Sequence, residues 1–336
     1  MFCLVRLGSR LAAAWLVVGA LALGVAACGD SGDSNVVSTP PPEPAKPEEF
    51  PSPKGKTLRD LLANVGSSGP VIAASVSQFQ PGENRFGFAL FNRARAQIAD
   101  AAVVLYVAPV GGGPVEGPIP ARFEQMNVKP QFQSRTVAED KDAANSLYVA
   151  DIDLPKAGRY EILGLTRLDG RIVAATPSGG ALTVTKGSQM PDVGDKAPVV
   201  NTDTVASANG NLESLDTRRP ASSMHDVDFA DVVGKKPTVL LFATAALCQS
   251  RVCGPVIDLT EQAKAERGDD IAFVHQEIYV DNQLDKGLRP PVAAYELPTE
   301  PWVFVVDASG RIVARYEGAF SVKELDAAID KAVRTS

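Results

Sequence analysis

The chain has few of the residues that bind soft metals or nucleic acids. Only two histidines occur among its 336 residues, and residues 57–190 contain neither histidine nor cysteine, while the two methionines there, Met126 and Met190, lie far apart. Copper chemistry is therefore not expected in that part, because soft metals need such ligands in clusters. Positive charge is also scarce, since 40 Asp and Glu outnumber 33 Lys and Arg and the net charge is −7. No nucleic-acid partner is expected, because such partners need a concentrated basic surface.

The longest apolar run lies at the N-terminus. Two arginines precede an apolar stretch at 11–27, which is the pattern of a signal peptide. The sequence VAAC at 25–28 resembles a bacterial lipobox. This resemblance implies that the signal peptide, residues 1–27, is removed and that Cys28 carries a diacylglycerol, with an acyl chain such as palmitate on its amine. The protein would then be lipid-anchored to the cell membrane on the extracytoplasmic side. An uncleaved transmembrane helix is the alternative, but the run is short for a span of ~20 residues.

This processing would leave two thiols. Cys3 would leave with the signal peptide and Cys28 would be lipidated, so only Cys248 and Cys253 remain. An exported compartment permits disulfides. We therefore expect this pair to be oxidisable, with each other or with a partner.

Composition divides the next part of the chain into a tether and a β-rich domain. Residues 28–56 are rich in Pro, Ser, Glu and Gly, which predicts a disordered tether. In residues 57–190, apolar and polar residues alternate in short segments, which favours a β-sandwich. The predicted strands are 71–79, 85–92, 99–109, 147–155, 158–170 and 181–186. The layout resembles immunoglobulin-like modules of bacterial exported proteins, and we expect this domain to be a spacer or a docking module for partners.

Residues 191–336 alternate between predicted strands and helices. The stretch VGDKAPVVNTDT at 193–204 resembles the opening of the redoxin group. A wholly apolar run at 238–243 suits a strand buried on both faces. The later elements are a helix at 255–268, a strand at 271–279, a hairpin at 301–318, and a helix at 321–333 that opens with a Ser321 cap and Glu324 three residues on. The order β-α-β-α-β-β-α is that of the thioredoxin fold. We therefore predict two domains, an all-β immunoglobulin-like sandwich followed by an α/β thioredoxin-like domain.

Cys248 directly precedes the predicted helix of this domain. Backbone N–H groups and the positive end of the helix dipole stabilise a thiolate there. The thioredoxin family has Cys-x-x-Cys, whereas Cys248 and Cys253 are separated by four residues. On an ideal helix this spacing gives a rise of ~7.5 Å, which exceeds the reach of a disulfide. A bridge is therefore expected only if Cys248 lies before the helix and Cys253 in its first turn. Arg251 either adds positive charge beside the thiolate or is simply solvated.

Other residues bear on the same site. The sequence Glu300-Pro301-Trp302 resembles the cis-proline loop of the thioredoxin family, which implies that Pro301 and Trp302 position a substrate peptide at the active sulfur. An ordinary trans proline is the alternative. His275 lies inside a predicted strand, where a core histidine is commoner than a ligand. His225 is expected in a surface loop.

These features predict a membrane-anchored extracytoplasmic thiol/disulfide oxidoreductase. Cys248 would attack or be attacked at sulfur, Cys253 would resolve the mixed disulfide, and the partners would be protein thiols or disulfides. We expect no cofactor and no metal in this reaction. Three alternatives stay open. The pair may form a structural disulfide in a non-catalytic binding module. Its spacing also resembles that of Q-type atypical two-cysteine peroxiredoxins, although Leu241 and Pro301 stand where their proline and arginine are expected. The cysteines and His275 would bind Cu(I) if the chain is similar to copper-delivery relatives of this fold.

Overall fold

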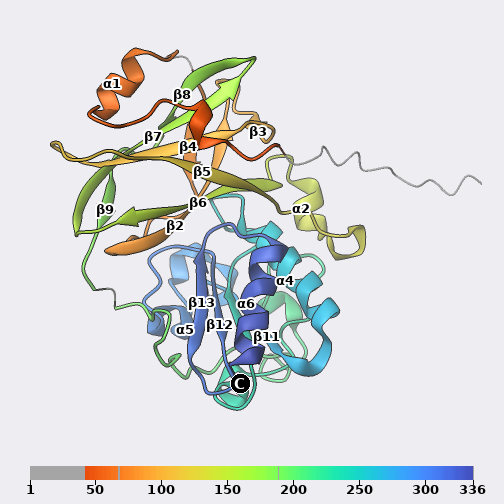
Figure 1. The fold of residues 1–336 in the computed structure, drawn as a ribbon. Coiled ribbons are helices and arrows are strands. Elements are labelled where there is room, and N and C mark those ends of the chain that lie inside the picture. The colour runs from red at the N-terminus through yellow and green to blue at the C-terminus, as the bar shows by residue number, and fades with distance from the viewer. Residues whose placement is uncertain (1–41, 67–68, 188, 336) are drawn as a thin grey trace, which may run out of the picture. The chain divides into compact units, whose positions relative to one another are not determined.

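The structure is a computed structural model in which residues 42–66, 69–187 and 189–335 are described. The predicted signal peptide and Cys28 lie outside these ranges. The described residues belong to one compact unit, Pro41–Ser336, which contains two β-sheets (Figure 1). Among the described residues, no helix has the length and apolar character needed to cross a bilayer.

The first sheet has nine strands. They are β1 (Val71–Ala74), β2 (Gly82–Phe91), β3 (Gln97–Ile98), β4 (Val103–Pro109), β5 (Glu116–Gln125), β6 (Ser146–Leu154), β7 (Gly158–Leu168), β8 (Arg171–Pro177) and β9 (Leu182–Val184). Two short helices, α1 (Leu58–Ala63) and α2 (Arg135–Glu139), belong to this half of the chain. All six strands predicted from the alternation are present, and the structure adds β3, β5 and β8.

Strand β1 closes the first sheet. The strand order is β1-β8-β7-β4-β5-β6-β2-β3, with β9 on β7. β1 is parallel to β8, with Val71 opposite Thr176, and antiparallel to β2, with Val71 opposite Phe91. The strands therefore form one closed sheet, and the predicted immunoglobulin-like sandwich is not confirmed.

Strand β4 is buried on both faces. Its alternate side chains point in opposite directions and enter two different apolar clusters. Leu105 lies in the core inside the closed sheet, whereas Tyr106 packs on the outside with Phe50. The Tyr106 hydroxyl also donates a hydrogen bond to the carbonyl of Pro51 at 2.7 Å. Residues 42–56 thus cover the sheet, and the prediction that they belong to a disordered tether is wrong for them. The prediction failed because it used the overall composition of residues 28–56, in which the buried side chain of Phe50 has little weight.

The second sheet lies in the C-terminal half. The elements there are α3 (Phe229–Val232), β10 (Thr238–Phe242), α4 (Cys253–Arg267), β11 (Ala272–Gln276), α5 (Pro290–Ala294), β12 (Trp302–Val306), β13 (Ile312–Glu317) and α6 (Val322–Arg334). The strand order is β11-β10-β12-β13, in which β10 and β11 are parallel and the other pairs are antiparallel. From β10 onward, the predicted order β-α-β-α-β-β-α is confirmed.

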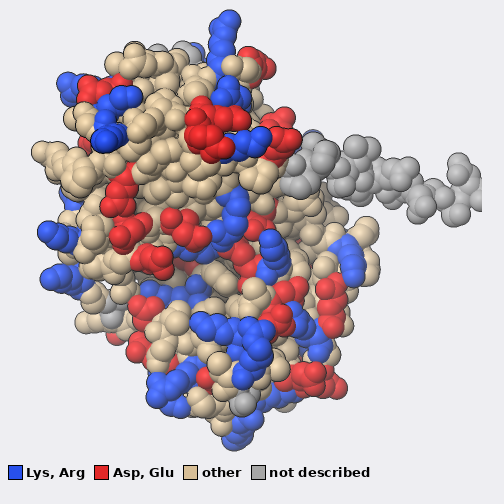
Figure 2. Space-filling view, in the orientation of Figure 1, with Lys and Arg blue, Asp and Glu red and all other residues tan. Residues whose placement is uncertain are grey.

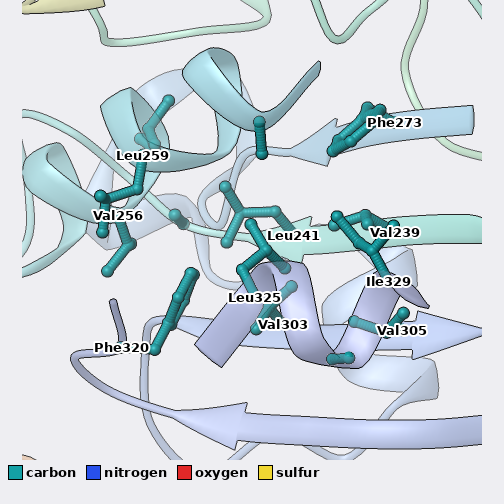
Figure 3. Close-up of a cluster of buried hydrophobic side chains, with 14 of the residues drawn as sticks. Val239, Leu241, Val256, Leu259, Phe273, Val303, Val305, Phe320, Leu325 and Ile329 are labelled. Carbon is teal, nitrogen blue, oxygen red and sulfur yellow. The ribbon is translucent and has the colours of Figure 1, made fainter. Parts of the chain in front are cut away.

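Apolar side chains cover both faces of the second sheet. Val239 and Leu241 of β10 face one cluster, and Leu240 and Phe242 face another on the opposite side. Figure 3 shows the first cluster, in which the strand side chains meet Val256 and Leu259 of α4 and Leu325 and Ile329 of α6. The apolar run of β10 is therefore enclosed on both sides, as the sequence predicted.

The two halves share this first cluster. Met126, Leu147 and Val149, from the closed-sheet half, pack in it together with side chains of α4. The β-rich half is therefore more than a spacer, because its removal would expose the core of the other half; its predicted role as a docking module stays a prediction.

Glu324 connects α6 to the closed sheet. It completes a capping box with Ser321, as predicted. Its carboxylate accepts hydrogen bonds from Arg85 Nε of β2 at 2.8 Å and from Arg122 Nη2 of β5 at 2.9 Å. Burial favours the protonated acid, but these hydrogen bonds and charges lower the pKa of Glu324 below its ordinary value.

Charged side chains of both signs are interspersed over the face drawn in Figure 2.

Ion pairs also connect helices α4 and α6. Arg267, at the end of α4, contacts Asp326 of α6 at 2.8 Å and Asp330 at 2.5 Å. This pairing holds the two helices side by side over the second sheet.

Candidate redox site

The two cysteines lie where β10 leads into α4. We call residues 243–252, between these elements, the redox loop. Cys248 lies in the loop, Val252 is the N-cap, and Cys253 is the first residue of α4. The cysteines form a disulfide with their Cα atoms 6.0 Å apart. The condition predicted for a direct bridge, one cysteine before the helix and the other in its first turn, is met.

The two sulfurs differ in access. Cys253 is fully buried in the core that the two halves share, whereas Cys248 is half-buried. A pocket of about 430 Å³ opens beside Cys248, lined by Gln249 of the redox loop and by Thr136 and Val137 of α2. An incoming sulfur can therefore reach Cys248, and Cys253 is shielded.

Two groups can stabilise negative charge on Cys248. The first is the N-terminal end of α4, a helix of 15 residues. The second is Ser250, whose hydroxyl oxygen lies 3.2 Å from the Cys248 sulfur. A disulfide sulfur carries no hydrogen, so the hydroxyl is the donor, and it can donate in the same way to a thiolate.

Arg251 is held by the closed-sheet half. Its guanidinium contacts Asp140 at 2.6 Å and Asp142 at 4.0 Å. Burial favours the protonated form of Asp140, but the hydrogen bond from Arg251 lowers its pKa. Arg251 is exposed, as the solvated alternative predicted, and its charge is also paired with the carboxylate of Asp140.

The sequence analysis missed a buried carboxylate next to the loop. Glu277 follows β11 and is fully buried. It accepts hydrogen bonds from the Thr217 backbone N–H at 3.0 Å and hydroxyl at 2.9 Å, and the Thr217 hydroxyl oxygen accepts one from Ala246 N–H in the redox loop at 3.0 Å. Glu277 thus connects to the loop through one side chain. The signal in the sequence is that Glu277 is the one acid in the predicted strand 271–279.

The proline segment is buried at its start. The Glu300–Pro301 bond is cis, as the resemblance implied. Pro301 is buried, and its carbonyl accepts a hydrogen bond from Gly318 N–H at 2.9 Å. Ser75, from the closed-sheet half, lies so close that a Cβ on Gly318 would be 1.9 Å from its carbonyl oxygen. The chain's own backbone therefore lies against Gly318, which pairs with Pro301. The substrate-positioning role of Pro301 stays a prediction.

Trp302 is part of the core. Its side chain is 2 % exposed and its ring stacks on Phe304, with centroids 6.1 Å apart. The ring nitrogen donates to the Thr299 hydroxyl at 3.0 Å. This burial leaves little of the ring for contact with a partner.

Glu300, directly before Pro301, is a second carboxylate in this region besides Glu277. Burial raises the pKa of Glu300, a hydrogen bond with Tyr279 acts against this shift, and the nearby charge of Glu277 adds to it. The carboxylates of Glu277 and Glu300 and the phenol of Tyr279 thus lie near one another. This group of side chains can hold a proton.

His275 lies where the sequence predicted, and His225 does not. His275 is a fully buried core histidine with hydrogen-bond partners, as expected. His225 is 1 % exposed, so its prediction as a surface-loop residue is wrong; its Nε2 lies 3.1 Å from Asp216 Oδ2. Among the described residues, the one group with metal-ligand spacing is Asp216, His225 and His275, without a cysteine. The Cu(I) set of two cysteines and His275 is therefore not assembled.

No protein-family model and no curated protein sequence matches the chain. Solved structures with thioredoxin-like folds match part of it. A putative thiol:disulfide interchange protein DsbE from Chlorobium tepidum is 16% identical and covers 43% of this chain and 99% of its own, with a TM-score of 0.31. A thioredoxin-like superfamily protein is 18% identical over 41% of this chain and 96% of its own, with a TM-score of 0.29. A thioredoxin family protein from Chlorobium tepidum TLS, also described as a thiol:disulfide interchange protein, is 17% identical over 44% and 99%, with a TM-score of 0.28. At this level of similarity the function has to be inferred from the site itself.

Proposed function

We propose that the chain is a thiol/disulfide oxidoreductase and that Cys248–Cys253 is its exchangeable disulfide. The observation that carries the proposal is the unequal access of the two sulfurs. Cys248 is half-buried beside a pocket, and Cys253 is fully buried at the first residue of α4. A structural disulfide has no need of this asymmetry, whereas exchange needs one sulfur that meets the partner and one that resolves the intermediate.

The exchange proceeds in two balanced steps. A partner thiolate attacks the Cys248 sulfur, the Cys248–Cys253 bond breaks, and Cys253 leaves as a thiolate and takes up a proton. A second thiolate of the partner then attacks the partner's sulfur in the mixed disulfide and releases Cys248 as a thiolate. Two electrons have then passed from the partner to the protein. The reverse sequence reduces a partner disulfide. In both directions, the α4 N-terminus and Ser250 stabilise the charge on Cys248.

The closed-sheet half takes part in binding the partner. Thr136, Val137 and Asp140 supply one wall of the pocket beside Cys248. A second pocket of about 690 Å³ is lined by residues of both halves and includes Ser250 to Val252 of the redox loop. A protein thiol or disulfide would therefore dock against the loop and the closed-sheet half together.

The membrane anchor is part of the same proposal. It is supported by the lipobox-like sequence at 25–28, which precedes the described residues. A lipid on Cys28 would hold the redox site on the extracytoplasmic side, where protein disulfides persist. Incorporation of a labelled palmitate by the wild type, and its loss in Cys28→Ala, is the expected result; equal labelling of both proteins would contradict the anchor.

A pair of matched variants tests the redox function. In Cys253→Ser the accessible Cys248 remains, and we expect it to form a mixed disulfide with oxidised glutathione at least ~100-fold faster than Cys253 does in Cys248→Ser. The wild-type pair should have a reduction potential above about −300 mV. The rates are measured by mass spectrometry after acid quenching. Two equally slow variants and a lower potential would instead establish a structural disulfide.

A further inference from the structure

A second cluster with chemical potential lies apart from the disulfide. Asp216, His225 and His275 are all buried, and one ligand atom from each lies within 4.8 Å of the others. Asp216 and His225 lie in the segment that connects β9 to α3, and His275 lies in β11. The cluster thus joins a loop to the second sheet.

The hydrogen bonding calls for a positive charge between two of these side chains. The Nε2 of His275 lies 3.1 Å from the carbonyl oxygen of Ala243, which can only accept, so this nitrogen carries the hydrogen. In a neutral ring the Nδ1 then presents a lone pair. It faces Asp216 Oδ2 at 3.2 Å and Ser222 Oγ at 3.1 Å. A lone pair directed at a carboxylate oxygen is unfavourable, so this contact needs either a proton on Nδ1 or a metal ion bound by both atoms.

His225 points at the same oxygen. Its Nε2 lies 3.1 Å from Asp216 Oδ2, while its Nδ1 is buried and has no hydrogen-bond partner among the described residues. The ring is therefore oriented by what its Nε2 contacts. Two imidazole nitrogens from different parts of the chain converge on one carboxylate oxygen.

The distances match those of a compact metal site. Zinc binds nitrogen and oxygen ligands at about 2.0–2.2 Å, so ligands of a tetrahedral site lie roughly 3.3–3.5 Å apart. The contacts of Asp216 Oδ2 with the two histidines, at 3.1 and 3.2 Å, are close to this value. Ser222 Oγ, at 3.1 Å from His275 Nδ1, is placed as a fourth ligand and the second oxygen donor.

The surroundings have the pattern of a metal site's outer contacts. A metal-bound histidine commonly donates its other N–H to a backbone carbonyl, as His275 does to Ala243. The carboxylate of Asp216 is also fixed, since it accepts from Arg218 N–H and Ser222 N–H, each at 2.7 Å. These contacts hold the ligands in place before any ion binds.

We propose that Asp216, His225 and His275 bind a structural divalent metal ion of the Zn²⁺ class, with Ser222 as an oxygen donor. Two imidazoles and oxygen ligands suit Zn²⁺, which is borderline between hard and soft. The ligands are sealed from solvent, so the ion enters as the chain folds and leaves no open position for catalysis. It fixes the loop that holds Asp216 and His225 against β11, and it reaches the start of the redox loop through Ala243.

The experiment measures metal in the full chain with its disulfide intact, so that no thiolate is available. Protein folded with Zn²⁺ and then dialysed should retain one ion per chain, and its melting temperature should be higher than that of protein folded with a chelator. Folding with Co²⁺ should give the visible absorption of a tetrahedral nitrogen and oxygen site. No retained metal and no difference in melting temperature would overturn the proposal.

Variants assign the ligands. We expect Asp216→Asn and His275→Ala to lower Zn²⁺ affinity by more than about 100-fold, and Ser222→Ala by about 10-fold. The matched control is Cys248→Ser/Cys253→Ser, which should keep the metal. If a ligand variant does not fold, the Co²⁺ spectrum of the wild type still decides, because thiolate coordination gives intense charge-transfer bands that this site lacks. Metal lost only in the cysteine variant would refute the assignment.

Discussion

The two halves of the described chain differ in their content of reactive residues. The closed-sheet half, residues 42–187, contains no cysteine or histidine, whereas the C-terminal half contains Cys248, Cys253 and both histidines. The closed-sheet half nevertheless forms one wall of the pocket beside Cys248 and engages Arg251 through Asp140. A residue count alone would assign the site to one half, but the structure builds it from both.

The contact between the halves also determines access to the sulfurs. Gly254, the second residue of α4, allows α2 to approach closely, because a Cβ there would lie 2.9 Å from Val137 Cγ2. The same contact region covers Cys253, while Cys248 stays at the pocket. Access to the two sulfurs therefore depends on how the halves pack together, and substitutions at their contact test this dependence.

The largest effect is expected at Asp258 of α4. It pairs with Arg218 at 2.8 Å, and it accepts a hydrogen bond from Ser134 N–H at 2.8 Å in the closed-sheet half. Burial raises the pKa of Asp258, although these contacts favour its ionised form. Asp258→Ala leaves Arg218 buried without its partner, so we expect a loss of about 3–5 kcal/mol in the free energy of unfolding. Urea unfolding measures it, and a loss below 1 kcal/mol would show that the pair contributes little.

Leu147→Ala tests the shared core. Leu147 belongs to β6 but packs in the cluster that includes α4, and it is 1 % exposed. Removing its side chain leaves a cavity, and we expect a loss of about 3 kcal/mol. Trp302 fluorescence reports on the C-terminal half and should shift to lower urea concentration together with circular dichroism. An unchanged Trp302 transition would mean that the halves unfold independently.

The ion pairs of Glu324 predict a dependence on pH. Its pKa is lowered in the folded protein, so the stabilisation is present above the unfolded value near 4.5 and is lost as the pH falls through the folded value. E324Q keeps the capping box but not the charge, and we expect it to lose about 2 kcal/mol at pH 7. The difference between wild type and E324Q, measured by urea unfolding, should shrink below pH 4.5. A difference that is constant with pH would contradict the assignment.

Local patterns predicted much of this fold. Alternation identified six strands of the closed sheet, and apolar runs with caps identified the order of the C-terminal elements. Strand β5 was missed because Gly117, Pro118 and Pro120 are typical of turns. Pro120 is nevertheless paired opposite Val104 in β4. Pairing with neighbouring strands decided its conformation, and that information is not local.

The candidate site was predictable to a similar degree. The position of the cysteine pair followed from the strand and helix signals around it. The burial of His225 did not, because its partner Asp216 lies nine residues away across a turn, and the role of Glu277 depends on Thr217, 60 residues earlier. Burial of a polar side chain depends on partners that tertiary structure brings close, and one sequence shows the side chain without the partner.

The smallest effect on stability is expected for Asp140→Asn. Its partner Arg251 is exposed, so the ion pair should contribute little to the free energy of unfolding, and less still at high salt. The effect on chemistry should be larger, because a released Arg251 can place its charge near Cys248 and favour the thiolate. The rate of Cys248 alkylation against pH, measured in Cys253→Ser with and without Asp140→Asn, should shift to lower pH in the double variant. Arg251→Gln in the same background is the control and should remove the shift. An identical pH profile in all three proteins would show that the closed-sheet half holds Arg251 without influencing the sulfur.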